Sequence, residues 1–317
     1  MTYEEALAYL GSLEALGIRP GLDRIRVLLA RLGDPQTAFP SVLIAGTNGK
    51  GSVAAFTASI LRHAGYAPGV YTSPHLVTFE ERIVVGEEPI PGPEVAALTS
   101  ELRRVIVGDR LLRNDPPTYF EATTALAFLH FRRRKIPIAV LEVGMGGRFD
   151  ATNVVTPLAG AITQIAMDHT RWLGPSLGEI AYQKAGILRR GVTAAVSKQE
   201  PAALEAIRAE AGRIGAPVIL TTDCDIRAAG ATAHGAPVGP GRFSDPPVFS
   251  LATPNGSRYP EIALSLRGVH QVENAVTAVL LTEHLAATFA DDGWSKEDLK
   301  RHLFETVRRP YRALLPD

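Results

Sequence analysis

"SVLIAGTNGKGSVAAFTASILRHAG", residues 41–65, predicts an apolar strand, a glycine-rich loop and a helix in direct succession. The strand occupies residues 41–45, and the helix continues from the lysine of "NGK" until Gly65 ends it. A loop of this kind turns several backbone N–H groups and the positive end of a helix toward one point. The stretch therefore predicts a binding site for an anion such as a phosphate group.

The loop departs from the common phosphate-binding pattern G-x-x-x-x-G-K-[ST]. Ile44 stands in place of the first glycine, and Gly51 separates Lys50 from the hydroxyl of Ser52. Glycines let the backbone approach phosphate oxygens closely, and the lysine supplies a positive charge. The candidate phosphate-binding residues are Gly46, Thr47, Asn48, Gly49, Lys50, Gly51 and Ser52. The alternative is a turn between strand and helix that binds nothing.

Strands and helices alternate along most of the chain. Helices are expected at 3–16, 22–33, 50–65, 93–112, 118–134, 176–188 and 201–213, and strands at 41–45, 68–73, 136–144, 158–165, 191–197 and 216–221. The strands are apolar without polar alternation, which is typical of a parallel sheet covered by helices on both faces. The fold class is therefore α/β, with a mostly parallel P-loop-type sheet flanked by helices.

The composition changes between residues 223 and 267, where glycine and proline are frequent. The alternating segments "PPVFSLA" and "EIALSLRG" lie on either side of the turn "TPNGSRYP". This pattern predicts a small antiparallel sheet at the edge of the main one. Helices at 269–288 and 295–307 are expected to follow, and no internal repeat is evident.

The composition indicates an ordinary globular protein of 317 residues, 46% of them hydrophobic. The 33 acidic and 33 basic residues balance, so neither nucleic acid nor a membrane is an expected partner. Cys224 is the only cysteine, and the N-terminus lacks the pattern of a signal peptide, so a cytoplasmic location is expected.

Lysine is rare in this chain, which draws attention to Lys184 in the helix 176–188 as a candidate functional residue. The alternative is that Lys184 is a solvated helix lysine without such a role.

Polar side chains lie at the carboxyl ends of three predicted strands, where open parallel sheets bind their ligands. They are Ser73, Glu142 and His169, the last preceded by Asp168. Magnesium prefers oxygen ligands together with phosphates and water, so a hydroxyl and a carboxylate suit it. For His169 the alternative is a hydrogen-bonded loop residue. Glu142 needs a cation because its strand is apolar, and Arg148 is the alternative partner.

With these features together, the chain resembles the folylpolyglutamate synthase and dihydrofolate synthase family, a branch of the Mur-type ATP-dependent amide ligases. The segments that carry the resemblance occur in the family's order and spacing: "GTNGKGS" (46–52), "YTSPHL" (71–76), "FEERI" (79–83), "LEVGMGGRFDATN" (141–153), "MDHT" (167–170), "QKAGI" (183–187) and "GVHQVENA" (268–275). The resemblance implies the Mur-ligase central-domain fold over residues 1–307, including N-terminal helices that face folate.

The resemblance also implies roles for individual residues. The loop would hold the ATP phosphates, with Lys50, Lys184 and His169 as catalytic residues. Ser73 and Glu142 would bind one magnesium ion, and Glu142 and His169 a second. Lys184 matches a lysine that is carbamylated in relatives. His270, Asn274 and Arg312 would contribute to ATP binding, the last within "RRPYR", which departs from the family's "WPGR"; Glu80, Arg82, Asp150 and Ala151 would face the folate or pteroate.

The reaction that the resemblance implies joins L-glutamate to a folate or pteroate carboxylate through an acyl phosphate made from ATP. Relatives continue into a C-terminal glutamate-binding domain, and residues 308–317 would be the remnant of the linker to it, with a separate C-terminal domain as an expected partner. Two alternatives stay open: an inactive fragment or nucleotide-binding pseudoenzyme, and a Mur-type ligase acting on another carboxylate. The sequence leaves dihydropteroate and tetrahydrofolate equally open as acceptors.

Overall fold

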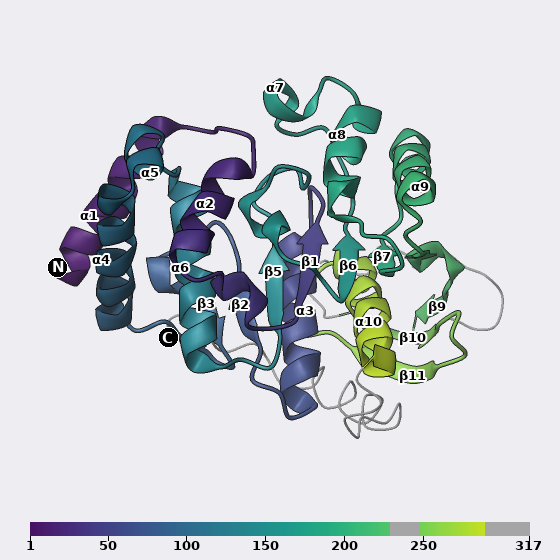
Figure 1. Cartoon of the computed structure of the whole chain (residues 1–317). Coiled ribbons are helices and arrows are strands. Elements are labelled where there is room, and N and C mark those ends of the chain that lie inside the picture. Colours follow the sequence, from purple (N-terminus) through teal and green to yellow (C-terminus); the bar gives the residue numbers. More distant parts are fainter. Residues whose placement is uncertain (229–246, 289–317) are drawn as a thin grey trace.

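Residues 41–65 form the strand, loop and helix that their sequence predicts, at the centre of the main sheet (Figure 1). The computed structural model describes residues 1–228 and 247–288. Strand β1 (Ser41–Ala45) is buried along its whole length, and helix α3 (Lys50–His63) follows the loop. Leu43 packs into one core, whereas Val42 and Ile44 pack into the other. Because strand side chains alternate between faces, β1 contributes to both cores.

The main sheet has eight strands in the described part of the chain, in the order β4-β3-β2-β5-β1-β6-β7-β8. The strands are β1, β2 (Gly69–Tyr71), β3 (Ile83–Val85), β4 (Glu88–Pro89), β5 (Ala139–Glu142), β6 (Ala159–Ile162), β7 (Ala194–Val196) and β8 (Val218–Leu220). β1 pairs in parallel with both β5 and β6. From β1 the chain crosses to β2 on one side, and from β5 it crosses past β1 to β6 on the other side, so the carboxyl end of β1 lies at a topological switch point, where α/β proteins bind ligands.

Helices cover both faces of this sheet, as the apolar strands predicted. One core, under the first face, draws residues from α1 (Tyr3–Ser12), α2 (Asp23–Arg31), α4 (Gly92–Gly108), α6 (Tyr119–Arg134), α8 (Leu177–Lys184) and α9 (Pro201–Ile214). The other core draws residues from α3 and α10 (His270–Thr288), which pack side by side (Figure 1). No helix within residues 1–228 and 247–288 is long and apolar enough to cross a membrane.

The region 223–267 contains the predicted antiparallel strands, but they form a sheet of their own. β9 (Asp225–Ala228), β10 (Val248–Ala252) and β11 (Arg258–Ala263) have the order β11-β10-β9. The predicted small antiparallel sheet is therefore confirmed, and none of its described strands pairs with the main sheet. Phe249, Leu251 and Tyr259 pack with α10 in the second core, so apolar burial against a helix takes the place of edge pairing.

Several shorter elements differ from the prediction. β3 and β4 were not predicted, and they add an antiparallel edge beside β2. The helix expected at 93–112 is divided, because the Asp109 side chain accepts from the N–H groups of Leu111 and Leu112 and starts α5 (Arg110–Asn114). α7 (Thr170–Leu173) is an additional helix. The remaining 3-10 helices are η1 (Leu13–Leu16), η2 (Pro35–Thr37), η3 (Phe79–Arg82), η4 (Ala151–Val154), η5 (Ala185–Ile187) and η6 (Thr221–Asp223). The expected helix 295–307 and the boundary at 307 lie outside the described residues.

Candidate functional site

Two loop glycines occupy positions that other residues could not adopt without strain. Gly46 has φ 143°, and a Cβ there would lie 1.8 Å from Oγ1 of Thr163. Gly49 has φ 88°, and a Cβ there would lie 2.2 Å from Oδ1 of Asn274. Left-handed backbone and close approach both favour glycine, so these residues fix the path of the loop into α3.

Hydrogen bonds fasten the first part of the loop to the end of β6. The backbone N–H groups of Thr47 and Asn48 both donate to the carbonyl of Gln164, at 3.0 and 3.1 Å. The Thr47 hydroxyl bonds both the N–H and the carbonyl of Ala166, at 3.1 and 3.2 Å. These donors are therefore used inside the protein. The N–H groups at the start of α3 have no acceptor within their own helix, and they are the ones that can bind phosphate oxygens.

Two lysine amines lie against the same loop. Nζ of Lys50 donates to the carbonyl of Thr47 at 3.1 Å, and Nζ of Lys184 donates to the carbonyl of Gly46 at 2.6 Å. Lys184 is only 3% exposed, which rules out the solvated helix lysine that the sequence left open. Burial, followed by the positive charge of Lys50, lowers the pKa of Lys184 to about 8. Roughly a tenth of its amine is therefore unprotonated at pH 7, far more than for an ordinary lysine.

The carboxylate of Glu142 lies under the start of α3. It is 5% exposed, and its Oε2 accepts from the N–H of Ser73 at 3.2 Å. A Cβ at Gly51 would lie 3.7 Å from the same oxygen. Burial raises the pKa of Glu142 to about 7, and the Lys50 charge opposes this shift. Arg148 is not its partner, because that guanidinium pairs with Glu210 instead.

His169 lies at the mouth of a cleft rather than in the interior. Its backbone has φ 48°, and its Nε2 is 3.6 Å from Oδ2 of Asp168; each of the two side chains is 47% exposed. Within residues 1–228 and 247–288, no three histidine, cysteine or acidic side chains gather closely enough to hold a metal ion by themselves. Ser73 and Glu142, which are joined by the Ser73 N–H bond, carry a hydroxyl and a carboxylate, and these are donor types that magnesium takes along with phosphate and water.

Replacing Glu142 with glutamine should stabilise the protein at neutral pH in the absence of metal and nucleotide. The pKa of this carboxyl is about 7 in the folded protein and 4.5 ordinarily, so the wild type loses stability as the pH rises from about 4.5 through 7. Glutamine removes that loss, which amounts to about 2 kcal/mol above pH 7 after allowance for relaxation of the site. Urea unfolding at pH 5, 6, 7 and 8 measures it.

Glu205 on α9 provides the control, because this residue stays exposed to solvent in the folded protein. Glu205→Gln should follow the wild-type stability at all four pH values. A Glu142→Gln curve that ran parallel to the wild type from pH 5 to pH 8 would contradict the raised pKa.

A cleft of about 560 Å³ opens between the N-terminal segment and the loop that follows β5. Arg82, Asp150 and Ala151, the residues assigned to the folate side, line it together with Ser73 and His169. It is also lined by residues 17–21, in the early segment expected to cover this side, and by Tyr119, Phe120, Met145, Phe149, Trp172 and Leu173. The large apolar share of these walls suits a flat aromatic ligand with a few polar groups.

Polar groups of the cleft are held in place by neighbours. Nε of Arg82 bonds Nδ1 of His75 at 2.7 Å, and the guanidinium lies 5.5 Å from the centre of the Tyr119 ring. Asp150 accepts from the N–H of Met145 at 2.9 Å and from both donors of Thr152, and burial raises its pKa. These bonds orient Arg82 and Asp150 before any ligand arrives.

Glu80, the fourth residue assigned to this side, does not line the cleft. It lies beside Tyr3 of α1, where burial and then the Glu80 carboxylate raise the pKa of the Tyr3 hydroxyl to about 12. Its neighbour Arg82 takes the opposite direction into the cleft wall.

A second cavity of about 690 Å³ is lined by residues of the glycine-rich loop. His270 and Asn274 line it with Asn48, Gly49 and Ser52, so these two residues of α10 do meet the phosphate-binding candidates. Lys198, Gln199 and Glu200 also line it and were not predicted, although they follow the carboxyl end of β7, where the same strand-end rule could have found them. Arg312 lies outside the described residues.

Comparisons with known proteins give one consistent picture. Residues 44–282 match the model of the Mur ligase middle domain. The chain is 39% identical over 284 residues to the dihydrofolate synthase/folylpolyglutamate synthase of Bacillus subtilis, covering 89% of this chain and 64% of that protein. It is 40% identical over 296 residues to a probable bifunctional folylpolyglutamate synthase/dihydropteroate synthase of Halobacterium salinarum, covering 92% of this chain and 34% of that protein. The chain thus spans less than two thirds of either relative.

Solved structures agree with this picture. The apo form of the L. casei enzyme FPGS has a TM-score of 0.85 and 31% identity, covering 96% of this chain and 72% of that chain. A complex described as FPGS-AMPPCP-folate has a TM-score of 0.82 and 31% identity, covering 98% of this chain and 73% of that chain.

Proposed function

Because the chain belongs to the Mur ligase family and, within it, to the folylpolyglutamate and dihydrofolate synthases, we propose that it carries the ATP- and folate-binding body of a ligase. The proposed ligase adds L-glutamate to a folate or pteroate carboxylate. One observation carries the proposal: residues of the glycine-rich loop line one cavity, and Ser73, whose N–H bonds the Glu142 carboxylate next to Gly51, lines the other. The cavity lined by His270 and Asn274 suits a nucleotide, and the cleft lined by Arg82 and Asp150 suits the folate. The solved structures described as FPGS-AMPPCP and FPGS-AMPPCP-folate complexes support the assignment of both ligands.

The proposed reaction begins with transfer of the ATP γ-phosphate to the substrate carboxylate, which gives an acyl phosphate. The amine of L-glutamate then attacks the acyl carbon, and phosphate leaves. The N–H groups of residues 49–52 and the Lys50 amine would hold the phosphates and neutralise charge in the transition state. The apolar walls of the cleft would limit the access of water to the acyl phosphate.

Magnesium would supply further neutralisation of phosphoryl charge when bound. Ser73 and Glu142 offer neighbouring oxygens for one ion, and Glu142 with His169 is the proposed pair for a second. Lys184 is proposed to carry a carbamate, which its buried amine of lowered pKa supports, because carbon dioxide reacts with an unprotonated amine. An arginine could not be modified in this way.

The folate side is proposed to use Arg82, Asp150 and Ala151, with Tyr119 and Phe120 as apolar walls. Glu80 is proposed to act indirectly, through the backbone that carries Arg82. L-glutamate is proposed to be bound by a further domain, in the same polypeptide or in a separate chain.

The test is glutamate incorporation. The chain is incubated with MgATP, labelled L-glutamate and either dihydropteroate or tetrahydrofolate, alone and with a C-terminal domain supplied from a relative. Incorporation that depends on ATP is the expected result, and the preferred acceptor identifies the substrate. Absence of incorporation in every combination, together with tight ATP binding, would instead favour a nucleotide-binding pseudoenzyme. Incorporation of glutamate into a different carboxylate would favour another Mur-type ligase.

A further inference from the structure

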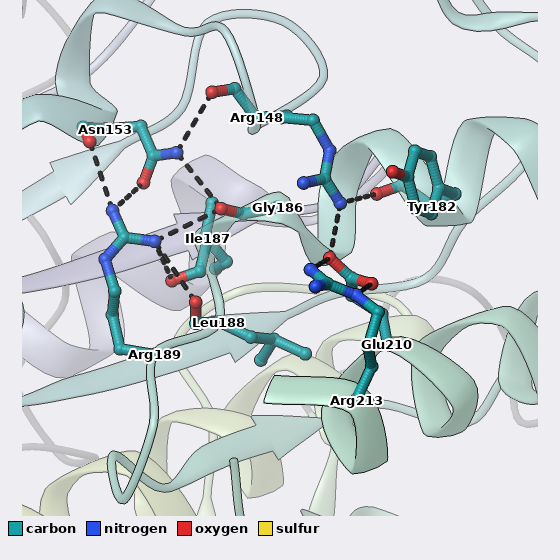
Figure 2. A network of polar contacts seen from close by, with 9 residues as sticks. All are labelled: Arg148, Asn153, Tyr182, Gly186, Ile187, Leu188, Arg189, Glu210 and Arg213. Carbon is teal, nitrogen blue, oxygen red and sulfur yellow. Dashed lines mark hydrogen bonds and ion pairs between the residues drawn. The ribbon is translucent and has the colours of Figure 1, made fainter. Parts of the chain in front are cut away.

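The backbone that carries Lys184 is fastened from outside both cavities (Figure 2). The Lys184 amine donates a hydrogen bond to the Gly46 carbonyl. Because Lys184 belongs to the segment 182–188, the position of its amine depends on how the backbone of this segment is held. The polar network in Figure 2 joins Tyr182, Gly186, Ile187 and Leu188 of this segment to neighbouring side chains, and two of its arginines, Arg148 and Arg189, do not line either cavity described above.

The loop after β5 is in direct contact with the Lys184 segment. The N–H of Arg148 donates to the carbonyl of Gln183 at 2.9 Å. A Cβ at Gly186 would lie 2.4 Å from Cβ of Arg148, and a Cβ at Gly147 would lie 2.7 Å from the Lys184 carbonyl. The two backbones therefore touch without space between them, and a shift of one must move the other.

Helix α9 holds the Arg148 side chain in this position. Nη2 of Arg148 donates to Oε1 of Glu210 at 2.5 Å, and the guanidinium stacks 4.2 Å from the centre of the Tyr182 ring. The Glu210 side chain is only 2% exposed and also accepts two bonds from Arg213, at 2.7 and 2.8 Å. We name Arg148 and Glu210 the α9 clasp; Figure 2 shows Arg148 and Arg213 converging on the Glu210 carboxylate.

A second set of bonds fixes the other end of the segment. The guanidinium of Arg189 donates to the carbonyls of Gly186, Ile187 and Leu188, at 3.2, 3.1 and 3.1 Å. It also donates to Oδ1 of Asn153 at 2.6 Å, and the Asn153 amide in turn donates to the Gly186 carbonyl at 3.1 Å. The Asn153 amide also donates to the Arg148 carbonyl at 3.2 Å, so the two sets meet at Arg148, and the α9 clasp acts on the end that lies nearest Lys184.

We propose that Glu210, acting through Arg148, is a positioning residue that sets the place of the Lys184 amine at the phosphate loop. The consequence for catalysis rests on the proposed function, whereas the effect on Lys184 itself does not. Neither Glu210 nor Arg148 lines a cavity, so the effect passes through the backbone contact at Gln183 and not through a ligand.

The experiment uses the small number of lysines in the chain. Lysine labelled with carbon-13 at Cε is incorporated, its signals are followed by NMR from pH 6 to 11, and the Lys184 signal is assigned by Lys184→Arg. Glu210→Leu releases Arg148. Arg213→Ala is the matched control, because it removes an ion pair from the same carboxylate but leaves Arg148 bound. The charged groups that face Lys184, which are Lys50, Asp150 and Asp168, stay the same in both variants.

The Lys184 signal of the wild type should titrate near pH 8. In Glu210→Leu its midpoint should rise by about one pH unit, because a loosened segment admits water and the cost of burying the charge falls. Affinity for MgAMPPCP, measured by calorimetry, should fall about tenfold, whereas Arg213→Ala should match the wild type in both measurements.

Circular dichroism of each variant shows whether it is folded. If Glu210→Leu does not fold, Glu210→Gln, which keeps the shape and an acceptor, should show a smaller shift in the same direction. A folded variant at position 210 whose Lys184 signal keeps the wild-type position and midpoint would overturn the proposal. The NMR readout needs no ligase activity. A shifted Lys184 signal in the variant, together with no glutamate incorporation by the wild type, would contradict the proposed function and still support the positioning role.

Discussion

Replacing Lys50 with alanine should weaken binding of MgAMPPCP by about 100-fold, because a charge-assisted bond to a phosphate contributes roughly 3 kcal/mol. The amine of Lys50 already lies at the loop, 3.1 Å from the Thr47 carbonyl, so it needs little movement to reach an outer phosphate. ATP-dependent glutamate incorporation should fall by about 1,000-fold, because the same charge stabilises the transition state for phosphoryl transfer. Calorimetry and the incorporation assay measure the two effects separately.

Lys135→Ala provides the control for Lys50→Ala, because this exposed lysine ends α6 away from the loop. It should leave both affinity and activity unchanged. An unaltered affinity in Lys50→Ala, with the fold intact, would remove the loop from the nucleotide site.

Replacing Gly46 with alanine should destabilise the protein by about 4 kcal/mol. The left-handed backbone contributes roughly 1–3 kcal/mol of strain, and the overpacking against Thr163 contributes a similar amount. The new Cβ would lie 1.8 Å from the Thr163 hydroxyl and 3.0 Å from the Thr163 backbone nitrogen, and the second distance cannot be relieved by rotating a side chain. Chemical unfolding measures the loss.

Gly51→Ala is the matched control for Gly46→Ala in the same loop. Its φ is not left-handed, and its Cβ would meet nothing nearer than the Glu142 carboxylate at 3.7 Å. Because position 51 lies in the first turn of α3, alanine should stabilise the protein by about 0.5–1 kcal/mol. An equal loss of stability in both variants would contradict the conclusion that Gly46, and not Gly51, needs a left-handed and closely packed backbone.

The phosphate loop was predictable because its information is local. Adjacent glycines, a lysine and a strand-to-helix transition fix the backbone within a few residues, and the strand-end rule then placed Ser73, Glu142 and His169 on the correct side of the sheet. The pattern could not separate a buried Lys184 from a solvated one, since that depends on what the loop after β5 covers. The resemblance supplied the role of Lys184, and the structure supplies its burial.

Long-range pairing explains most of what the sequence could not predict. Arg148 was an alternative partner for Glu142 because the two are close in sequence, but its partner Glu210 lies 62 positions away on α9. β3 and β4 are short, and the charged residues beside them hide the apolar signal of an edge strand. The aromatic cleft walls from α6, Tyr119 and Phe120, could not be told from core residues without knowing which way that helix faces.

The double burial of β1 has a consequence for binding at the loop that follows it. β1 is enclosed by both cores and paired on both sides, so its backbone has almost no freedom left to lose. The loop continues from that backbone and is tied to β6 by the N–H groups of Thr47 and Asn48. A phosphate that arrives there meets a receptor already ordered by folding, and little of its binding free energy is offset by the entropy of arranging the loop.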